Sequence, residues 1–307
     1  MGMRFFSTKD RPFHMGPYPL ERLKRTSSMP DLNQVPASKQ LDFHDLDTPH
    51  SLVNAMGEYQ AMMDAIRDGA VNPTPATAPS DPQERSNHMK AFGYFQDTSM
   101  IGICTLPRSA LLVEPTRNSD IDRLANDIRT KQTKTLTSGI DQIMAALKES
   151  IEAPLEAIDH HTHAIVLLVE HHRDPKAHEP GSEWIMGTQD HRAALRGTET
   201  AVILAEYLHL LGFSARAHTS SSSDVDMNQL AVAAGLVSVE KGRLFAPYIG
   251  EGFGLAVVTT NFEMAVDEPL APWIDQPNSP AWWVGKGTSK SALNRDPYAK
   301  RRYVDGA

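Results

Sequence analysis

The sequence contains very little cysteine, because Cys104 is the only one in 307 residues. A disulfide needs two thiols, and a cysteine-rich zinc site or a cysteine-ligated iron–sulfur cluster needs up to four thiolates. The cysteines of this chain alone therefore cannot build any of these sites. Cys104 itself lies in an apolar segment, which is typical of a small core residue with a raised pKa rather than of a nucleophile.

Excess positive charge and long apolar runs are also missing. The formal net charge is -8, so the average field of the protein repels phosphate backbones and anionic lipids. No stretch is long and apolar enough to cross a bilayer, and the opening residues become polar too soon for a secretory signal. We therefore expect no nucleic-acid partner, no membrane association and a cytoplasmic location.

Proline-rich stretches divide the chain. Residues 1–49 are rich in proline, serine and charge and predict an extended N-terminal arm. Ser51 fits the N-cap of an amphipathic helix over 52–66, and the prolines of 71–82 predict an extended linker. The predicted organisation is an arm, helix and linker over 1–82, an α+β body over 83–270 and an irregular C-terminal tail over 271–307.

The body alternates helices with strands. Apolar periodicity predicts helices over 84–96, 119–151, 188–211 and 228–234, and strands over 100–106, 164–169, 213–218, 244–248 and 253–260. Short spacing between the last strands favours antiparallel neighbours, whereas the alternation itself favours parallel ones. The predicted fold class is α+β, with a mixed sheet flanked by helices.

Histidines form two clusters, at 160–163 and at His171, His172 and Asp174. If 164–169 is a strand, His163 and His171 lie about 25 Å apart and cannot share a metal ion. The second cluster follows the end of that strand, so a metallohydrolase site there is one alternative. Solvated loop histidines are the simpler interpretation.

Three segments taken together carry a family resemblance: 228–236 (NQLAVAAGL), 243–250 (RLFAPYIG) and 255–260 (LAVVTT). They resemble the corrinoid-binding region of reductive dehalogenases and, more distantly, of epoxyqueuosine reductases. Residues 11–22 (RPFHMGPYPLER) are similar to the start of the non-respiratory branch of the dehalogenases. The resemblance covers about 84–269 together with the arm.

The resemblance implies a nitroreductase-like domain that holds cobalamin and receives electrons from two iron–sulfur clusters in a following segment. In the family's reaction a halogenated small molecule loses halide and gains a proton. The positions that would face a corrinoid in this sequence are Gly235, Leu236, Phe245, Tyr248 and Thr259.

The sequence departs from the family in two places. The family's Gly-Leu-Gly-x-x-Gly becomes GLVSVE at 235–240, so Val237 and Glu240 replace two glycines that let the backbone approach a ligand. No cysteine follows Pro269, where the cluster ligands should begin, so no iron–sulfur cluster is expected in this chain. No motif assigns a tyrosine as proton donor.

These departures lead to one main hypothesis and two alternatives. The chain is expected to be a cofactor-poor subunit, or N-terminal half, that supports corrinoid-dependent reductive dehalogenation beside a cysteine-rich iron–sulfur and corrinoid protein. The first alternative is a cobalamin-binding oxidoreductase with a pocket around Tyr248 and Thr259, supplied by a separate ferredoxin. A histidine-rich metallohydrolase at His171, His172 and Asp174 is the more remote one.

Overall fold

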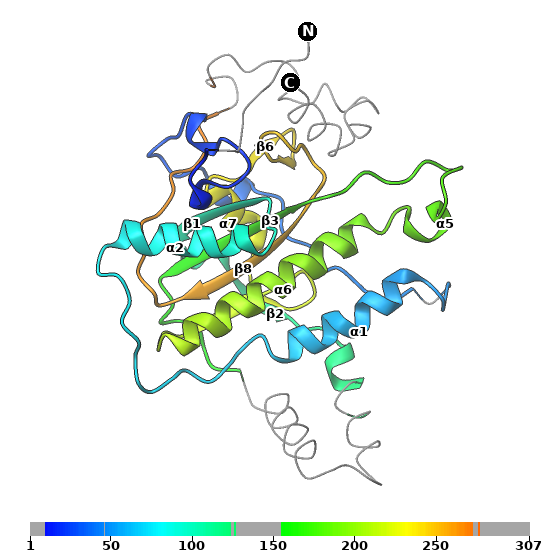
Figure 1. Ribbon diagram of the computed structural model, residues 1–307, viewed down its shortest axis with the longest axis horizontal. Helices are drawn as coiled ribbons and strands as arrows, with labels where there is room; N and C mark the ends of the chain where they lie inside the picture. The colour runs from blue at the N-terminus through cyan, green and yellow to red at the C-terminus, as the bar shows by residue number, and fades with distance from the viewer. Residues whose placement is uncertain (1–9, 46, 124–125, 127–154, 273–275, 277–307) are drawn as a thin grey trace.

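A four-stranded antiparallel sheet lies at the centre of the protein (Figure 1). The structure is a computed structural model that describes residues 10–45, 47–123, 126, 155–272 and 276. The strand order is β1-β3-β8-β4, with β1 at Met100–Thr105, β3 at His163–Glu170, β8 at Phe253–Thr260 and β4 at Ala215–His218. The unbroken apolar run of β3 is buried between β1 and β8, as its composition predicts.

The predicted α+β class is confirmed, but the predicted mixed sheet is wrong for the described residues, because every pairing among their strands is antiparallel. β8 is antiparallel to both β3 and β4, so β3 and β4 point the same way. Helix α6 (Gln189–Leu210) connects them as a crossover does. The later strand β8 lies between the two, so these parallel strands never pair.

Side chains alternate between the two faces of the sheet. Ile165 and Leu167 of β3 pack in a core with α2 (Pro82–Phe95) and α6, whereas Val166 and Leu168 pack with α7 (Met227–Ala233). In Figure 1, α2 and α6 cross one face of the sheet and α7 lies on the other. The sheet therefore separates two apolar cores.

The helix boundaries follow from local chemistry. The Ser51 hydroxyl accepts from the backbone N–H of Val53 at the start of α1 (Leu52–Ala65), and Asp81 caps α2 in the same way. Gly212, with φ +89°, follows the end of α6, and Asp226 caps α7. The predicted helices over 52–66, 84–96, 188–211 and 228–234 are confirmed.

Helix α1 is turned in a way that its apolar pattern does not predict. Its buried side carries Gln60 and Asp64 beside Val53, Gly57 and Ala61. Large apolar residues of the same helix, including Tyr59 and Met62, are exposed. The helix faces α6 with a polar and small-residue surface instead of its apolar one.

Several short elements escape prediction. β2 (Leu111–Thr116) pairs with β5 (Ser223–Val225), and β6 (Ser238–Glu240) pairs with β7 (Arg243–Phe245). The helix α5 (Ser182–Ile185) and the 3-10 turn η4 (Arg108–Ala110) were not predicted either. The strand predicted over 244–248 stops at Phe245, because a bridge between Ala246 and Gly250 turns the chain. The predicted helix over 119–151 and the tail over 271–307 lie mostly outside the described residues.

The described part of the arm contacts both sides of the sheet, since residues 13–15 pack on α2 and the Phe43 ring lies 5.1 Å from the His191 ring of α6. It contains only the single 3-10 turns η1 (Phe13–Met15), η2 (Leu20–Arg22) and η3 (Leu32–Gln34). Leu32 and Val35 join the core beside α7, and the Leu41 N–H donates to the Ser220 carbonyl at 2.8 Å. Within the described part of the chain, every helix is either too short or too polar to span a bilayer.

Candidate functional site

The structure divides the five predicted corrinoid-facing residues between two places. Gly235, Leu236, Phe245 and Tyr248 lie in the α7–β8 connection. Tyr248 stacks on Tyr18, the Tyr18 hydroxyl contacts Glu170, and Glu170 pairs with Phe253 at the start of β8. Thr259 lies six residues beyond Phe253 in β8, so the two residues are about 20 Å apart along the strand. The structure therefore does not bring Tyr248 and Thr259 together.

The space beside Gly235 is filled by the arm. The Arg25 guanidinium donates through Nη1 to the carbonyl oxygens of Gly235 at 2.7 Å and Glu268 at 2.9 Å. Gly235 has φ +64°, and a Cβ added there would lie 2.0 Å from Arg25 Nη1 and 2.3 Å from the Glu268 carbonyl. The glycine is required, but the group that approaches it closely belongs to this chain.

The arm also covers Tyr248. The rings of Tyr18 and Tyr248 stack with centroids 5.7 Å apart, and the Tyr248 hydroxyl donates to the Pro19 carbonyl at 3.1 Å. Burial raises the pKa of Tyr248 to about 12, so the phenol stays protonated at neutral pH. Leu236 is buried in the core on the same side of the sheet. Tyr248 therefore serves as an anchor for the arm.

Thr259 lies between two buried histidines. Its Oγ1 is 2.8 Å from His161 Nδ1 and 2.8 Å from His218 Nε2. Burial lowers the pKa of His218 to about 4. Burial, and then repulsion from His160, lowers that of His161 to about 3. Both rings are therefore neutral at pH 7.

The two neutral rings belong to a continuous chain of hydrogen bonds. His218 Nδ1 accepts from the Asp224 backbone N–H at 3.2 Å, so we assign the ring proton to Nε2, which donates to Thr259. Thr259 then donates to His161 Nδ1, and His161 Nε2 donates to Ser214 Oγ at 2.9 Å. Ser214 Oγ is also 2.9 Å from Nε2 of the exposed His160. With this assignment the bonds run in one direction, from His218 outward through Thr259 and His161 to Ser214.

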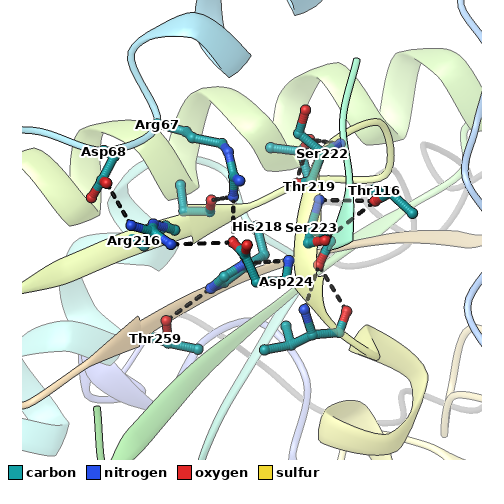
Figure 2. Close-up of polar contacts among 12 residues, drawn as sticks. Arg67, Asp68, Thr116, Arg216, His218, Thr219, Ser222, Ser223, Asp224 and Thr259 are labelled. Atoms are coloured by element: carbon teal, nitrogen blue, oxygen red, sulfur yellow. Dashed lines mark hydrogen bonds and ion pairs between the residues drawn. The ribbon is translucent and has the colours of Figure 1, made fainter. Parts of the chain in front are cut away.

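A charged cluster adjoins the inner end of this chain (Figure 2). Arg67 Nη1 donates to Asp224 Oδ2 at 2.9 Å, and Arg216 bridges Asp224 at 3.6 Å and Asp68 at 2.6 Å. Burial disfavours the ionised form of Asp224, but its hydrogen bond with the charged Arg67 outweighs this and lowers the pKa of the carboxyl group. Two cations and two carboxylates thus balance one another around a neutral histidine.

Asp64 forms a second buried centre on the inner side of α1. Its carboxylate accepts from Ser221 Oγ at 2.6 Å, Thr219 Oγ1 at 2.7 Å, Asn118 Nδ2 at 2.9 Å and Gln60 Nε2 at 3.1 Å. Burial raises the pKa of Asp64, although these four donors oppose that shift. Asp64 thus joins α1 to the β4–β5 turn, and all four of its donors are uncharged hydroxyl or amide groups.

The histidines of the metallohydrolase alternative do not converge. His171 Nε2 lies 3.3 Å from Asp190 Oδ1, His172 Nε2 lies 2.8 Å from Arg192 Nη2, and Asp174 accepts from Gln189. Each side chain thus contacts a different residue of α6. Among the described residues, no group of three or more His, Cys, Asp or Glu side chains is placed to hold a metal ion.

A separate open pocket of about 330 Å³ lies between the arm and α1. His44 and Glu58 are among its lining residues. It contains none of the residues predicted from the sequence.

Comparison with known proteins identifies the relationship. No protein-family model matches the chain, and no curated protein matches it. A solved structure of the catabolic reductive dehalogenase NpRdhA is 34% identical, with a TM-score of 0.67 over 92% of this chain and 34% of its own. The same enzyme in complex with 3-bromo-4-hydroxybenzoic acid is 33% identical, with a TM-score of 0.68 over 98% and 36%. The chain is a relative of the reductive dehalogenases.

The predicted resemblance to reductive dehalogenases is therefore confirmed. The chain spans about a third of the length of these structures. A more distant match is the epoxyqueuosine reductase of Streptococcus thermophilus, at 14% identity and a TM-score of 0.35 over 60% of this chain and 48% of its own.

One matching structure is described as suggesting a mechanism for B12-dependent dehalogenation, so cobalamin must be tested against the residues present here. At Gly235 the close approach is taken by Arg25, and at Tyr248 the ring face is taken by Tyr18. Thr259 is bonded on both sides by histidines. In this arrangement Gly235, Tyr248 and Thr259 do not fit a corrinoid.

The buried polar residues around Asp64 and Asp224 were not predicted from the sequence. Two signals could have revealed them. The strand Ala215–His218 alternates alanine with Arg216 and His218, which indicates a polar sheet face. In α1, Gln60 and Asp64 stand four residues apart and share one side of the helix.

Proposed function

We propose that this chain is a cofactor-poor part of a corrinoid-dependent reductive dehalogenase, acting as a separate subunit or as the N-terminal portion of a longer chain. It packs against a cofactor-carrying part and supports the dehalogenation of a halogenated small molecule there. The relationship to reductive dehalogenases, over about a third of their length, supports this proposal.

The contact between Arg25 and Gly235 is the single observation that carries the proposal. A turn that must lie close to a ligand needs glycine because a side chain would collide with that ligand. Here the same requirement is met by Arg25, which bonds two carbonyl oxygens at the turn. The turn therefore requires glycine, as a ligand-binding turn does, but the group that imposes the requirement is the arm.

The electron supply gives independent support. Thiolate-ligated clusters need several cysteines, and this chain has one, which is buried. Clusters that serve a corrinoid reaction must therefore be carried by other residues, on the same polypeptide or on a partner.

Purification under anaerobic conditions from the cells that make the protein tests the proposal. An affinity-tagged chain is expected to elute with a cysteine-rich protein or segment that contains cobalt and iron, which mass spectrometry and metal analysis would identify. A single species of the chain alone, free of both metals and of any cysteine-rich partner, would contradict the proposal.

The cobalamin-binding alternative requires the arm to leave Gly235 and Tyr248. Removing Arg25 should then increase cobalamin binding. If the proposal is right, neither the wild-type chain nor Arg25→Ala will bind cobalamin.

A further inference from the structure

Helix α1 and its C-cap residue Ile66 expose a regular row of apolar side chains. Leu52, Tyr59, Met62 and Ile66 are 41%, 62%, 48% and 43% exposed, and the exposed Ala55 completes the row. We call these five residues the α1 stripe. Their spacing alternates between three and four residues, which is the heptad spacing of a helix that packs along another helix.

The orientation of α1 is fixed by its opposite side. Gln60 Nε2 donates to Thr198 of α6 at 3.0 Å and to Ser221 at 2.8 Å, while Asp64 accepts from Ser221 and Thr219. Rotating the helix to bury the stripe would break these buried bonds and move a carboxylate outward. The stripe therefore stays on the surface while the body remains folded.

The surroundings of the stripe suit an apolar helical partner. Figure 1 shows α1 beside α6 at the rim of the molecule. The half-buried Met56 and Met63 flank the stripe, and methionine side chains adapt to irregular partner surfaces. Glu58 is the one exposed charged residue within α1 and sits at a flanking position. A partner helix with apolar residues at heptad spacing and a lysine or arginine opposite Glu58 would complement this face.

The length of the relatives indicates where such a helix comes from. About two thirds of each matching dehalogenase chain lies outside the part that this chain matches. We propose that the α1 stripe is the docking surface for an amphipathic helix of the cofactor-carrying part of the dehalogenase. This inference rests on the proposed function, and it adds the surface and the type of partner element.

Matched charge substitutions test the stripe. The double variant Tyr59→Glu/Met62→Glu places two carboxylates in the predicted seam. The control Phe95→Glu places one carboxylate at an apolar residue of α2 that is more exposed than either, at 70%. Both variants should keep the wild-type circular dichroism and unfolding midpoint. Cobalt that co-elutes per mole of tagged chain, together with the cysteine-rich partner, should fall roughly tenfold or more for the stripe variant and less than twofold for Phe95→Glu.

A photo-crosslink identifies the occupant directly. Because Cys104 is buried, Met62→Cys supplies a single accessible thiol for a benzophenone label. Illumination of the assembled protein should yield crosslinked peptides from a helix of the cofactor-carrying part, and a label at Phe95→Cys should not. Crosslinks between two copies of this chain, or a stripe variant that retains full cobalt, would overturn the inference.

The two proposals fail differently. If the wild-type chain never elutes with a cobalt-containing, cysteine-rich partner, the proposed function fails and the docking inference fails with it. If the wild-type complex forms but is insensitive to the stripe variant, only the docking inference fails.

Discussion

Arg25 and Gly235 lie 210 positions apart in the sequence, yet the arginine donates a 2.7 Å hydrogen bond to the carbonyl oxygen of the glycine. This contact joins the arm to the turn after α7, where the family resemblance placed a corrinoid. The arm thus completes the fold at the position where a cofactor was expected.

Gly235→Ala should destabilise the protein strongly, because the new methyl group would meet Arg25 at 2.0 Å and would also occupy a left-handed conformation. Gly242→Ala is the matched control, since Gly242 has φ +74° and no atom within 4 Å of an added Cβ. In the control, the free energy of unfolding should fall only by the cost of a left-handed conformation for alanine, about 1–2 kcal/mol. The fall for Gly235→Ala should be clearly larger. Urea unfolding measures both, and equal losses would mean that Arg25 does not occupy this space.

Arg25→Ala should lower the free energy of unfolding by about 1–3 kcal/mol, because the buried carbonyl of Gly235 and the carbonyl of the exposed Glu268 lose their donor. The control Arg243→Ala removes an exposed ion-pair partner of Glu251 and should change the free energy of unfolding by less than about 1 kcal/mol. Chemical denaturation of both variants gives the comparison. Matching small changes would show that the arm contributes little at this position.

Stability should fall as the pH drops from about 6.5 toward 4. The folded-state pKa values of His218 and His161 are lowered to about 4 and about 3, so in this window the unfolded chain binds more protons. Between pH 6.5 and 5, each histidine should lower the free energy of unfolding by on the order of 1–2 kcal/mol. Denaturation at stepped pH measures the slope, and His218→Gln should reduce it.

The effect of Asp64 on the pH dependence of stability is opposite to that of the two histidines. Its raised pKa means that the folded chain holds a proton above the unfolded value of 3.8, so its contribution is lost as pH rises through that window. Asp64→Asn should therefore steepen the acid loss caused by the histidines. An unchanged slope in both Asp64→Asn and His218→Gln would show that these groups do not control the acid response.

Cys104 should resist modification in the folded protein. It is buried in β1, and burial raises the pKa of its thiol to about 12, so almost no thiolate forms at pH 8. Ellman's reagent should find no reactive thiol in native protein and one per chain in urea. Native reaction at the rate of a free thiol would contradict this burial.

The sequence predicted what depends on local chemistry. The caps at Ser51 and Asp226 and the apolar run of β3 set element positions that the structure reproduces. Strand order was not predicted, because nothing near Phe253 indicates that β8 lies between β3 and β4. Pairings across long separations depend on the whole packed body.

The candidate site shows the same division. The resemblance singled out Gly235 and Tyr248 as corrinoid-facing positions, and the structure gives both a positive φ, which the sequence did not predict for Tyr248. Their partners, Arg25 and Tyr18, come from an arm whose composition predicted only an extended segment. The outward stripe of α1 was also missed, because periodicity identifies an apolar side without saying which side faces the core.

Titration of the purified chain with hydroxocobalamin shows whether the arm stands where a cofactor would bind. With the arm in place at Gly235 and Tyr248, we expect no saturable change in the corrinoid absorption spectrum. A saturable shift at about one cobalamin per chain would contradict this expectation and would make this chain a cofactor-binding part of the dehalogenase.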